Sequence, residues 1–155
     1  MSAAAAERVR GCIATAVEDG ARVAVGGPER PAHLPRGYFV QSTLLTDVRP
    51  DMAVAQEEIF GPVLCILPYE NEPEAVAIAN GTPYGLHGAV WSRDQEHAIA
   101  IARLLETGMV NLNGYGFDPL APFGGYKQSG VGREMGVAGL HEFLEVKAVQ
   151  SFSNS

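Results

Sequence analysis

Residues 86–113 read LHGAVWSRDQEHAIAIARLLETGMVNLN, a segment in which start, middle and stop signals follow one another. Residues 86–91 predict a strand, and Ser92 fits the first position of a capping box. The helix that it opens has apolar residues on one side and is expected to end at Gly108. Residues 109–113 then return as a strand. This alternation favours an α/β fold with a largely parallel sheet flanked by helices.

The same alternation continues on both sides of this segment. Apolar residues at helical spacing predict a helix from about residue 7 to residue 20, which would bury Cys12. Further helices are expected at residues 71–81, with Asn71 as the N-cap, and at about residues 134–143. Further strands are expected at residues 22–25, 38–45, 63–67 and 145–151. The continuous apolar run at 63–67 is typical of a strand buried on both faces, which would place Cys65 in the core.

The composition and charge of the chain argue against several classes of partner and site. The chain has 155 residues and a net charge of −7, so nucleic acid and anionic membranes are unfavourable partners. No apolar run approaches the roughly 20 residues that span a bilayer, and no targeting segment is evident, so we expect a cytoplasmic protein that does not bind membranes. The two cysteines and four histidines have no metal-ligand spacing, and no metal site is expected.

Two patterns suggest chemistry but are weak. Residues 130–136, GVGREMG, resemble a glycine-rich dinucleotide fingerprint, yet a loop precedes them and the chain continues too briefly to supply the second strand. We therefore reject this reading. A Cys65–His87 dyad stays open as a minor alternative, although an apolar strand raises the pKa of a thiol instead of activating it.

Residues 57–62, EEIFGP, allow two interpretations. Two acids and an aromatic residue precede a Gly-Pro bend that leads into a buried strand, and loops at strand ends bind ligands in α/β proteins. On this interpretation Phe60 and at least one glutamate are displayed for binding. On the other, Phe60 staples the turn and the acids are solvated surface.

Four motifs together carry a family resemblance. They are EEIFGP (residues 57–62), NGTPYGL (80–86), NLNG (111–114) and PFGGYKQSGVGRE (122–134). In this order and spacing they resemble the aldehyde dehydrogenase superfamily, and the resemblance covers nearly the whole chain. It implies that residues 1–144 form a partial catalytic domain and that residues 145–155 form the C-terminal oligomerisation strand and tail. The family oxidises aldehydes to carboxylic acids with NAD or NADP.

The resemblance assigns two residues to the cofactor. Glu58 matches the acid that hydrogen-bonds the nicotinamide ribose, and Phe60 matches the aromatic residue beside the nicotinamide. A carboxylate can accept from two hydroxyls, and a flat apolar ring suits another flat ring.

The resemblance also assigns residues near the aldehyde. Phe117 and Phe123 match aromatics of the substrate tunnel, Asn113 lies at the strand end that borders it, and Glu134 matches an acid discussed as part of a proton path. Local alternatives stay open for two of them. Phe123 could anchor its glycine-rich loop, and Glu134 could simply favour the N-terminus of the following helix.

The departures from the family limit the activity. Four parts of the family's catalytic machinery have no counterpart in this sequence. They are the nucleophilic cysteine in its Gly-Gln-x-Cys-type loop, the general-base glutamate, the oxyanion-hole asparagine and the phosphate-binding half of the cofactor domain. Cys12 and Cys65 do not match the position of the nucleophile. We therefore expect a C-terminal fragment or split subunit that is inactive alone and binds no cofactor alone. Its partners would be an upstream half that carries the cysteine, or further copies in a dimer or higher homo-oligomer. The alternative is a non-catalytic oligomerising or protein-binding module.

Overall fold

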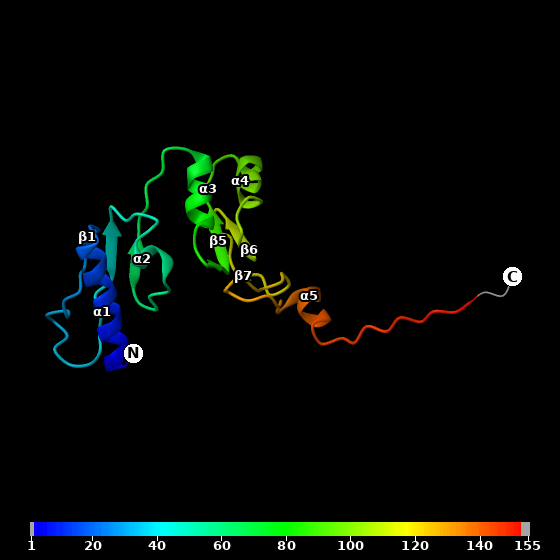
Figure 1. Cartoon of the computed structure of the whole chain (residues 1–155), viewed down its shortest axis with the longest axis horizontal. Helices are drawn as coiled ribbons and strands as arrows, with labels where there is room; N and C mark the ends of the chain where they lie inside the picture. Colours follow the sequence, from blue (N-terminus) through cyan, green and yellow to red (C-terminus); the bar gives the residue numbers. More distant parts are fainter. Residues whose placement is uncertain (1, 153–155) are drawn as a thin grey trace. The chain divides into compact units, whose positions relative to one another are not determined.

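The computed structural model describes residues 2–152, which fall into two compact units divided between Thr82 and Pro83 (Figure 1). Each unit combines short strands with helices. The α/β class expected from the sequence is confirmed. The strands form three small sheets, with parallel pairing in two of them.

The first unit is built on a three-stranded sheet in the order β1-β2-β3. Strand β1 (Arg22–Val25) runs antiparallel to β2 (Thr43–Thr46), and β2 runs parallel to β3 (Val63–Cys65). The preceding helix α1 (Ala3–Glu18) begins at Ser2, whose side chain accepts a hydrogen bond from the backbone of residue 5. The predicted strand at 22–25 and the N-terminal helix are thus confirmed.

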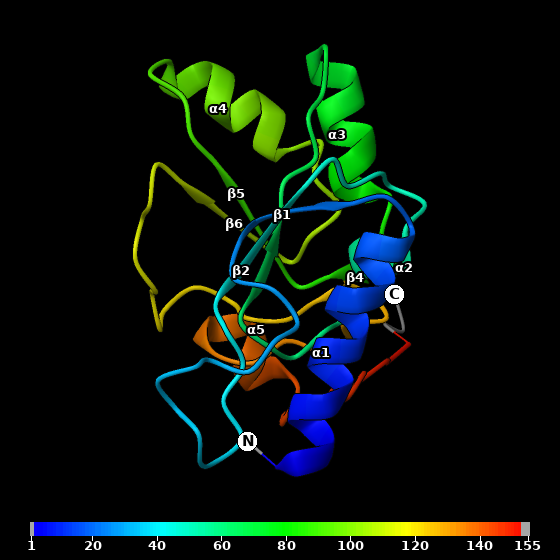
Figure 2. The ribbon, with the colours of Figure 1, turned by 90° about the vertical axis from the view of Figure 1, so that its left-hand side faces the viewer.

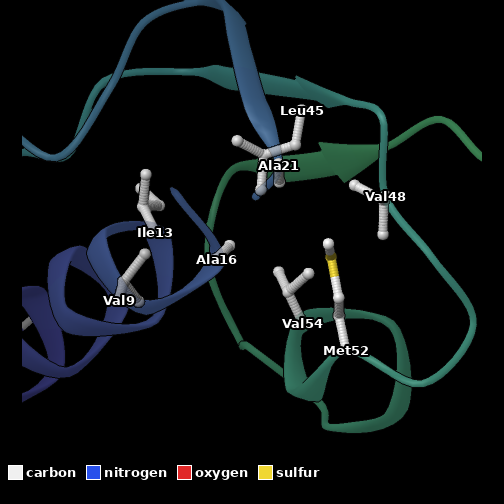
Figure 3. Close-up of a cluster of buried hydrophobic side chains, with 8 residues drawn as sticks. All are labelled: Val9, Ile13, Ala16, Ala21, Leu45, Val48, Met52 and Val54. Atoms are coloured by element: carbon white, nitrogen blue, oxygen red, sulfur yellow. The ribbon is translucent and has the colours of Figure 1, made fainter. Parts of the chain in front are cut away.

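One face of this sheet meets α1 and the short helix α2 (Ala53–Gln56) around a buried apolar cluster (Figure 3). Helix α1 supplies residues three or four positions apart, which lie on one side of a helix. The members of the cluster are Val9, Ile13, Ala16, Ala21, Leu45, Val48, Met52 and Val54.

Helix α3 (Glu72–Asn80) has the ends that the sequence predicts. The Asn71 side chain accepts from the backbone N–H of Glu74 at 3.0 Å, and Gly81 is the C-cap. Glu72 and Glu74 lie in the first turn, where the helix dipole favours negative charge.

The second unit contains the strand–helix–strand segment from which the fold was predicted. Strands β5 (His87–Val90) and β6 (Met109–Leu112) are parallel, and α4 (Gln95–Ala102) packs against both (Figure 2). The glycine-rich region that follows is mostly loop. Within it β7 (Tyr126–Lys127) pairs antiparallel with β4 (Tyr84–Gly85).

The ends of α4 differ from the prediction. Asp94, and not Ser92, is the N-cap: its Oδ1 accepts from the backbone of His97 at 3.0 Å, while the Ser92 Oγ accepts from the Asp94 N–H and shapes the turn before the helix. The helix ends at Ala102 and not near Gly108, because the following residues form tighter turn bonds to carbonyls three positions back.

Three predictions about the burial of residues or the length of strands are wrong. Cys12 is only half-buried, since it lies beside and not within the row of core residues on α1. Residues 38–42 are not in a strand, so only the end of the predicted strand forms. In β3, Cys65 packs against the core, but Leu64 points to the other face and is 64% exposed. Only one face of this strand is therefore covered.

The C-terminal segment also differs from the prediction. Helix α5 (Gly136–His141) is shorter than expected, and residues 145–152 form no strand. Figure 1 shows them running out from α5, away from the strands of the second unit, and Val146 is 97% exposed. A β-strand needs a hydrogen-bonded neighbour, which the described residues do not offer here.

Candidate functional site

The loop at residues 57–62 connects α2 to β3. The backbone N–H of Glu57 closes α2 on Ala53 at 2.8 Å, and the chain then extends outward. Phe60 adopts the left-handed region at φ 54° and is 76% exposed. A non-glycine residue rarely adopts this backbone conformation, so contacts from outside the loop would help to hold it there.

Such contacts come from α1 and β2. The Arg8 guanidinium donates from Nη1 to the carbonyl of Glu58 at 3.5 Å and from Nη2 to the carbonyl of Ile59. A Cβ added to Gly61 would lie 2.6 Å from the Val9 side chain, so the loop touches α1 closely. The carbonyl of Pro62 accepts from the backbone N–H of Thr43, the first residue of β2, at 2.8 Å. The loop is therefore fixed on both sides of Phe60.

The chemistry of this loop fits half of a nicotinamide nucleotide. The Glu58 side chain is exposed on the same loop as the exposed Phe60 ring. A carboxylate accepts hydrogen bonds from a pair of hydroxyls, as a ribose presents, and an aromatic ring offers a flat apolar face. The exposure of the Phe60 ring favours the interpretation in which it is displayed over the one in which it staples the turn, while the exposed Glu58 fits both interpretations.

In the second unit, Phe123 and Glu134 are brought together by their backbones. Each N–H donates to the carbonyl of the other, at 2.8 and 2.7 Å, in an isolated antiparallel bridge. A hollow of about 400 Å³ beside them is lined by residues of the segment 123–134 and by Leu86, Glu142 and Phe143. Phe123 is half-buried, whereas the Glu134 side chain is exposed.

Arg133 holds the glycine-rich segment together. Its Nη1 donates to the carbonyls of Gly125 and Gly132 at 2.9 and 2.8 Å, and its guanidinium lies over the Tyr126 ring at 5.5 Å from the centroid. Sequence reasoning assigned no role to Arg133 or to Arg8. Arg133 lies inside a motif that the sequence singled out, whereas Arg8 has no local sequence signal.

The other two expected site residues lie close in sequence but make different contacts. Asn113 is left-handed at φ 51°, and its Oδ1 accepts from the backbone N–H of Ser92 at 2.9 Å, so it joins the ends of β5 and β6. Phe117 is exposed on the loop that follows. Glu58 and Phe60 thus belong to the first unit, and the remaining four residues to the second.

The two cysteines lie in different surroundings. Cys65 donates weakly from Sγ to the carbonyl of Val54 at 3.8 Å, and burial raises the pKa of its thiol above the ordinary value of 9.0. Cys12 lines a cavity of about 330 Å³ with Thr15 and residues of α2 and the loop after it. A thiolate at Cys65 is disfavoured, which argues against the Cys65–His87 dyad.

Among residues 2–152, no group of three or more histidine, cysteine or acidic residues is arranged to hold a metal ion. None of the helices in this part of the chain is long and apolar enough to cross a bilayer.

Comparison with known proteins defines the class. The model of the aldehyde dehydrogenase family matches residues 1–149, and the chain belongs to this family. A 3-succinoylsemialdehyde-pyridine dehydrogenase of a Pseudomonas species is 52% identical over 149 residues, which are 96% of this chain and 31% of that protein. The chain therefore spans about a third of the length of such relatives.

Solved structures show the same relationship. An aldehyde dehydrogenase of Mycobacterium tuberculosis, complexed with NAD⁺, is 49% identical with a TM-score of 0.88 over 92% of this chain and 29% of that one. A mutant of aldehyde dehydrogenase C from Pseudomonas syringae, complexed with NAD⁺ and octanal, is 44% identical with a TM-score of 0.94 over 99% of this chain and 32% of that one. The structure thus has the α/β fold of about a third of an aldehyde dehydrogenase.

Proposed function

We propose that this chain acts as the C-terminal part of an NAD(P)-dependent aldehyde dehydrogenase, which oxidises an aldehyde to a carboxylic acid once an upstream half is present. Residues 1–144 would belong to the catalytic domain and residues 145–155 to an oligomerisation strand and tail. The observation that carries this proposal is the loop of Glu58 and Phe60. In a member of this family, an exposed acid and ring on a fixed loop support a nicotinamide site.

Glu58 would hold the nicotinamide ribose and Phe60 would pack beside the nicotinamide ring. The cofactor, NAD or NADP, supplies a hydride acceptor when bound. Two relatives solved with NAD⁺ support this class of ligand. A ribose contact and one stacked ring contribute only about 1–3 kcal/mol, so the 155-residue polypeptide alone would bind NAD⁺ with roughly millimolar affinity or weaker.

Phe117 and Phe123 would line the path of the aldehyde, Asn113 would border it, and Glu134 would take part in a proton path. The direct backbone pairing of Phe123 with Glu134 supports a shared role for these two residues. The P. syringae relative, which was solved with octanal, supports an aldehyde as the class of substrate.

The 155-residue polypeptide by itself would not oxidise aldehydes. The chemistry needs a thiolate to attack the aldehyde and a base to activate water, and Cys65 is a half-buried thiol whose pKa is raised. Replacing Cys12 and Cys65 with serine should therefore change no catalytic signal of this polypeptide. Aldehyde-dependent NADH formation that is lost on either replacement would contradict the proposal.

A chimera tests the proposal directly. Residues 1–155 would replace the matching third of active aldehyde dehydrogenase C from P. syringae, which this chain matches over 99% of its length. We expect the chimera to form NADH from octanal and NAD⁺. Glu58→Gln and Phe60→Ala should each weaken NAD⁺ binding about fivefold or more, whereas the neighbouring Glu57→Gln should not. A folded chimera in which Glu58→Gln and Phe60→Ala leave the dissociation constant of NAD⁺ unchanged would contradict the assignment.

A non-catalytic oligomerising or protein-binding module is the second candidate. It is favoured by the C-terminal segment, where Val146, Val149 and Phe152 are all exposed. An open segment of this kind can add to a sheet of another chain. Light scattering should report a dimer or larger assembly that weakens when residues 146–155 are deleted. A monodisperse monomer at micromolar concentration would count against it, and co-purification with a chain that carries the family's cysteine would favour the enzyme.

A further inference from the structure

One side chain of helix α1, that of Arg8, donates hydrogen bonds to the loop of Glu58 and Phe60. The Arg8 guanidinium donates to the carbonyl of Glu58 at 3.5 Å and to the carbonyl of Ile59. These are the two carbonyls that immediately precede Phe60. Some 50 residues of sequence separate the arginine from its acceptors.

The helix that carries Arg8 is itself firmly held. The next residue, Val9, is fully buried in the core, and so is Ile13 one turn later. Val9 also touches the loop on the far side of Phe60, where a Cβ on Gly61 would lie 2.6 Å from its side chain. Adjacent residues of α1 therefore contact the loop immediately before and immediately after Phe60.

The loop needs such support because Phe60 is left-handed and its ring packs against little else, being 76% exposed. A guanidinium is a planar fork that can donate to two successive carbonyls at once, which a lysine ammonium does less well. Arg8 thereby restricts the rotation of the two peptide groups that set the direction of the Glu58 carboxylate and the Phe60 ring.

We propose that Arg8 is a positioning residue, which fixes Glu58 and Phe60 in the orientation required by a nicotinamide ribose. The inference rests on the proposed function for the ligand, but the fixing of the loop can be measured without it. Arg8 would touch no cofactor and would act only through the loop.

The first experiment uses the 155-residue chain and amide hydrogen exchange. Arg8→Met should accelerate exchange at Glu57 and Val63, whose N–H groups are bonded at the two ends of the loop, about five- to tenfold. Arg10→Met is the matched control on the same helix, because Arg10 donates instead to the carbonyl of Phe39 at 2.7 Å. It should leave both amides within about twofold of the unchanged protein. Equal exchange in the Arg8→Met and unchanged proteins would overturn the inference.

The second experiment measures NAD⁺ binding to the chimera by calorimetry. Arg8→Met should raise the dissociation constant about fivefold, Arg8→Lys should rescue part of it, and the KM for octanal should not change. In a background with both Glu58→Gln and Phe60→Ala, Arg8→Met should add less than about twofold, because it acts through those residues. If those two substitutions weaken binding but Arg8→Met does not, the role of Arg8 is refuted and the proposed function survives. If those two substitutions also have no effect, the proposed function itself fails.

Discussion

The two units of the chain differ in their internal packing. Among the described residues, nearly all of the buried apolar side chains belong to residues 1–82, whereas Ala98 is the exception in residues 83–155. In the first unit α1 covers one face of a sheet with branched side chains. In the second unit Trp91, Leu120, Val131 and Phe143 are exposed.

The second unit relies on close backbone packing in place of a core. A Cβ at Gly108 would lie 1.6 Å from the carbonyl oxygen of Gly124, and a Cβ at Gly124 would lie 2.3 Å from that of Gly132. Both units expose large apolar side chains, but among the described residues only the first has a buried apolar cluster of its own.

The largest effect is expected from a substitution in the core of the first unit. Leu45→Ala removes a fully buried side chain from β2 and should lower the free energy of unfolding by about 2–5 kcal/mol. Leu140→Ala makes the same chemical change on α5, where Leu140 is 58% exposed, and should cost less than about 1 kcal/mol. Chemical denaturation measures both. Equal losses would show that the two units do not differ in this way.

A smaller effect is expected from a substitution that disturbs the backbone packing of the second unit. Gly108→Ala forces a methyl group against the backbone of Gly124 and should destabilise this unit by about 1–3 kcal/mol. Amide exchange should accelerate in residues 123–127 but not in α1. The matched control is Gly116→Ala, since a Cβ there meets nothing within 4 Å, and it should change stability by less than about 1 kcal/mol. Faster exchange in both units would indicate one cooperative fold.

The smallest effect concerns the cap of α4. Asp94→Ala removes the acceptor for the His97 N–H and should cost about 1 kcal/mol of stability in the second unit. Ser92→Ala should cost only a few tenths of that, because the Ser92 Oγ bonds the turn before the helix. The capping box expected from sequence gives the opposite order. Thermal unfolding of the two variants therefore separates the two assignments.

The residues of the candidate site could be predicted from the sequence, whereas the contacts that hold them in place are seen only in the structure. Glu58, Phe60, Phe123 and Glu134 stand in motifs that resemble those of the family, and their roles remain proposals. The contact of Arg8 with the Glu58 loop could not be predicted, because nothing local links residues 50 positions apart. The backbone pairing of Phe123 with Glu134 likewise depends on how the glycine-rich loop folds back.

The sequence by itself determined the α/β class, the parallel strand–helix–strand segment and the ends of α3. These features follow from local periodicity, caps and turn residues, which act over a few neighbouring positions. Only the tertiary structure decided that Leu64 is exposed, that residues 145–152 have no partner strand within residues 2–152, and that Arg8 holds the loop before Phe60. Burial and strand pairing depend on which distant surfaces meet, and a short window of sequence contains no information about surfaces that lie elsewhere in the chain or outside it.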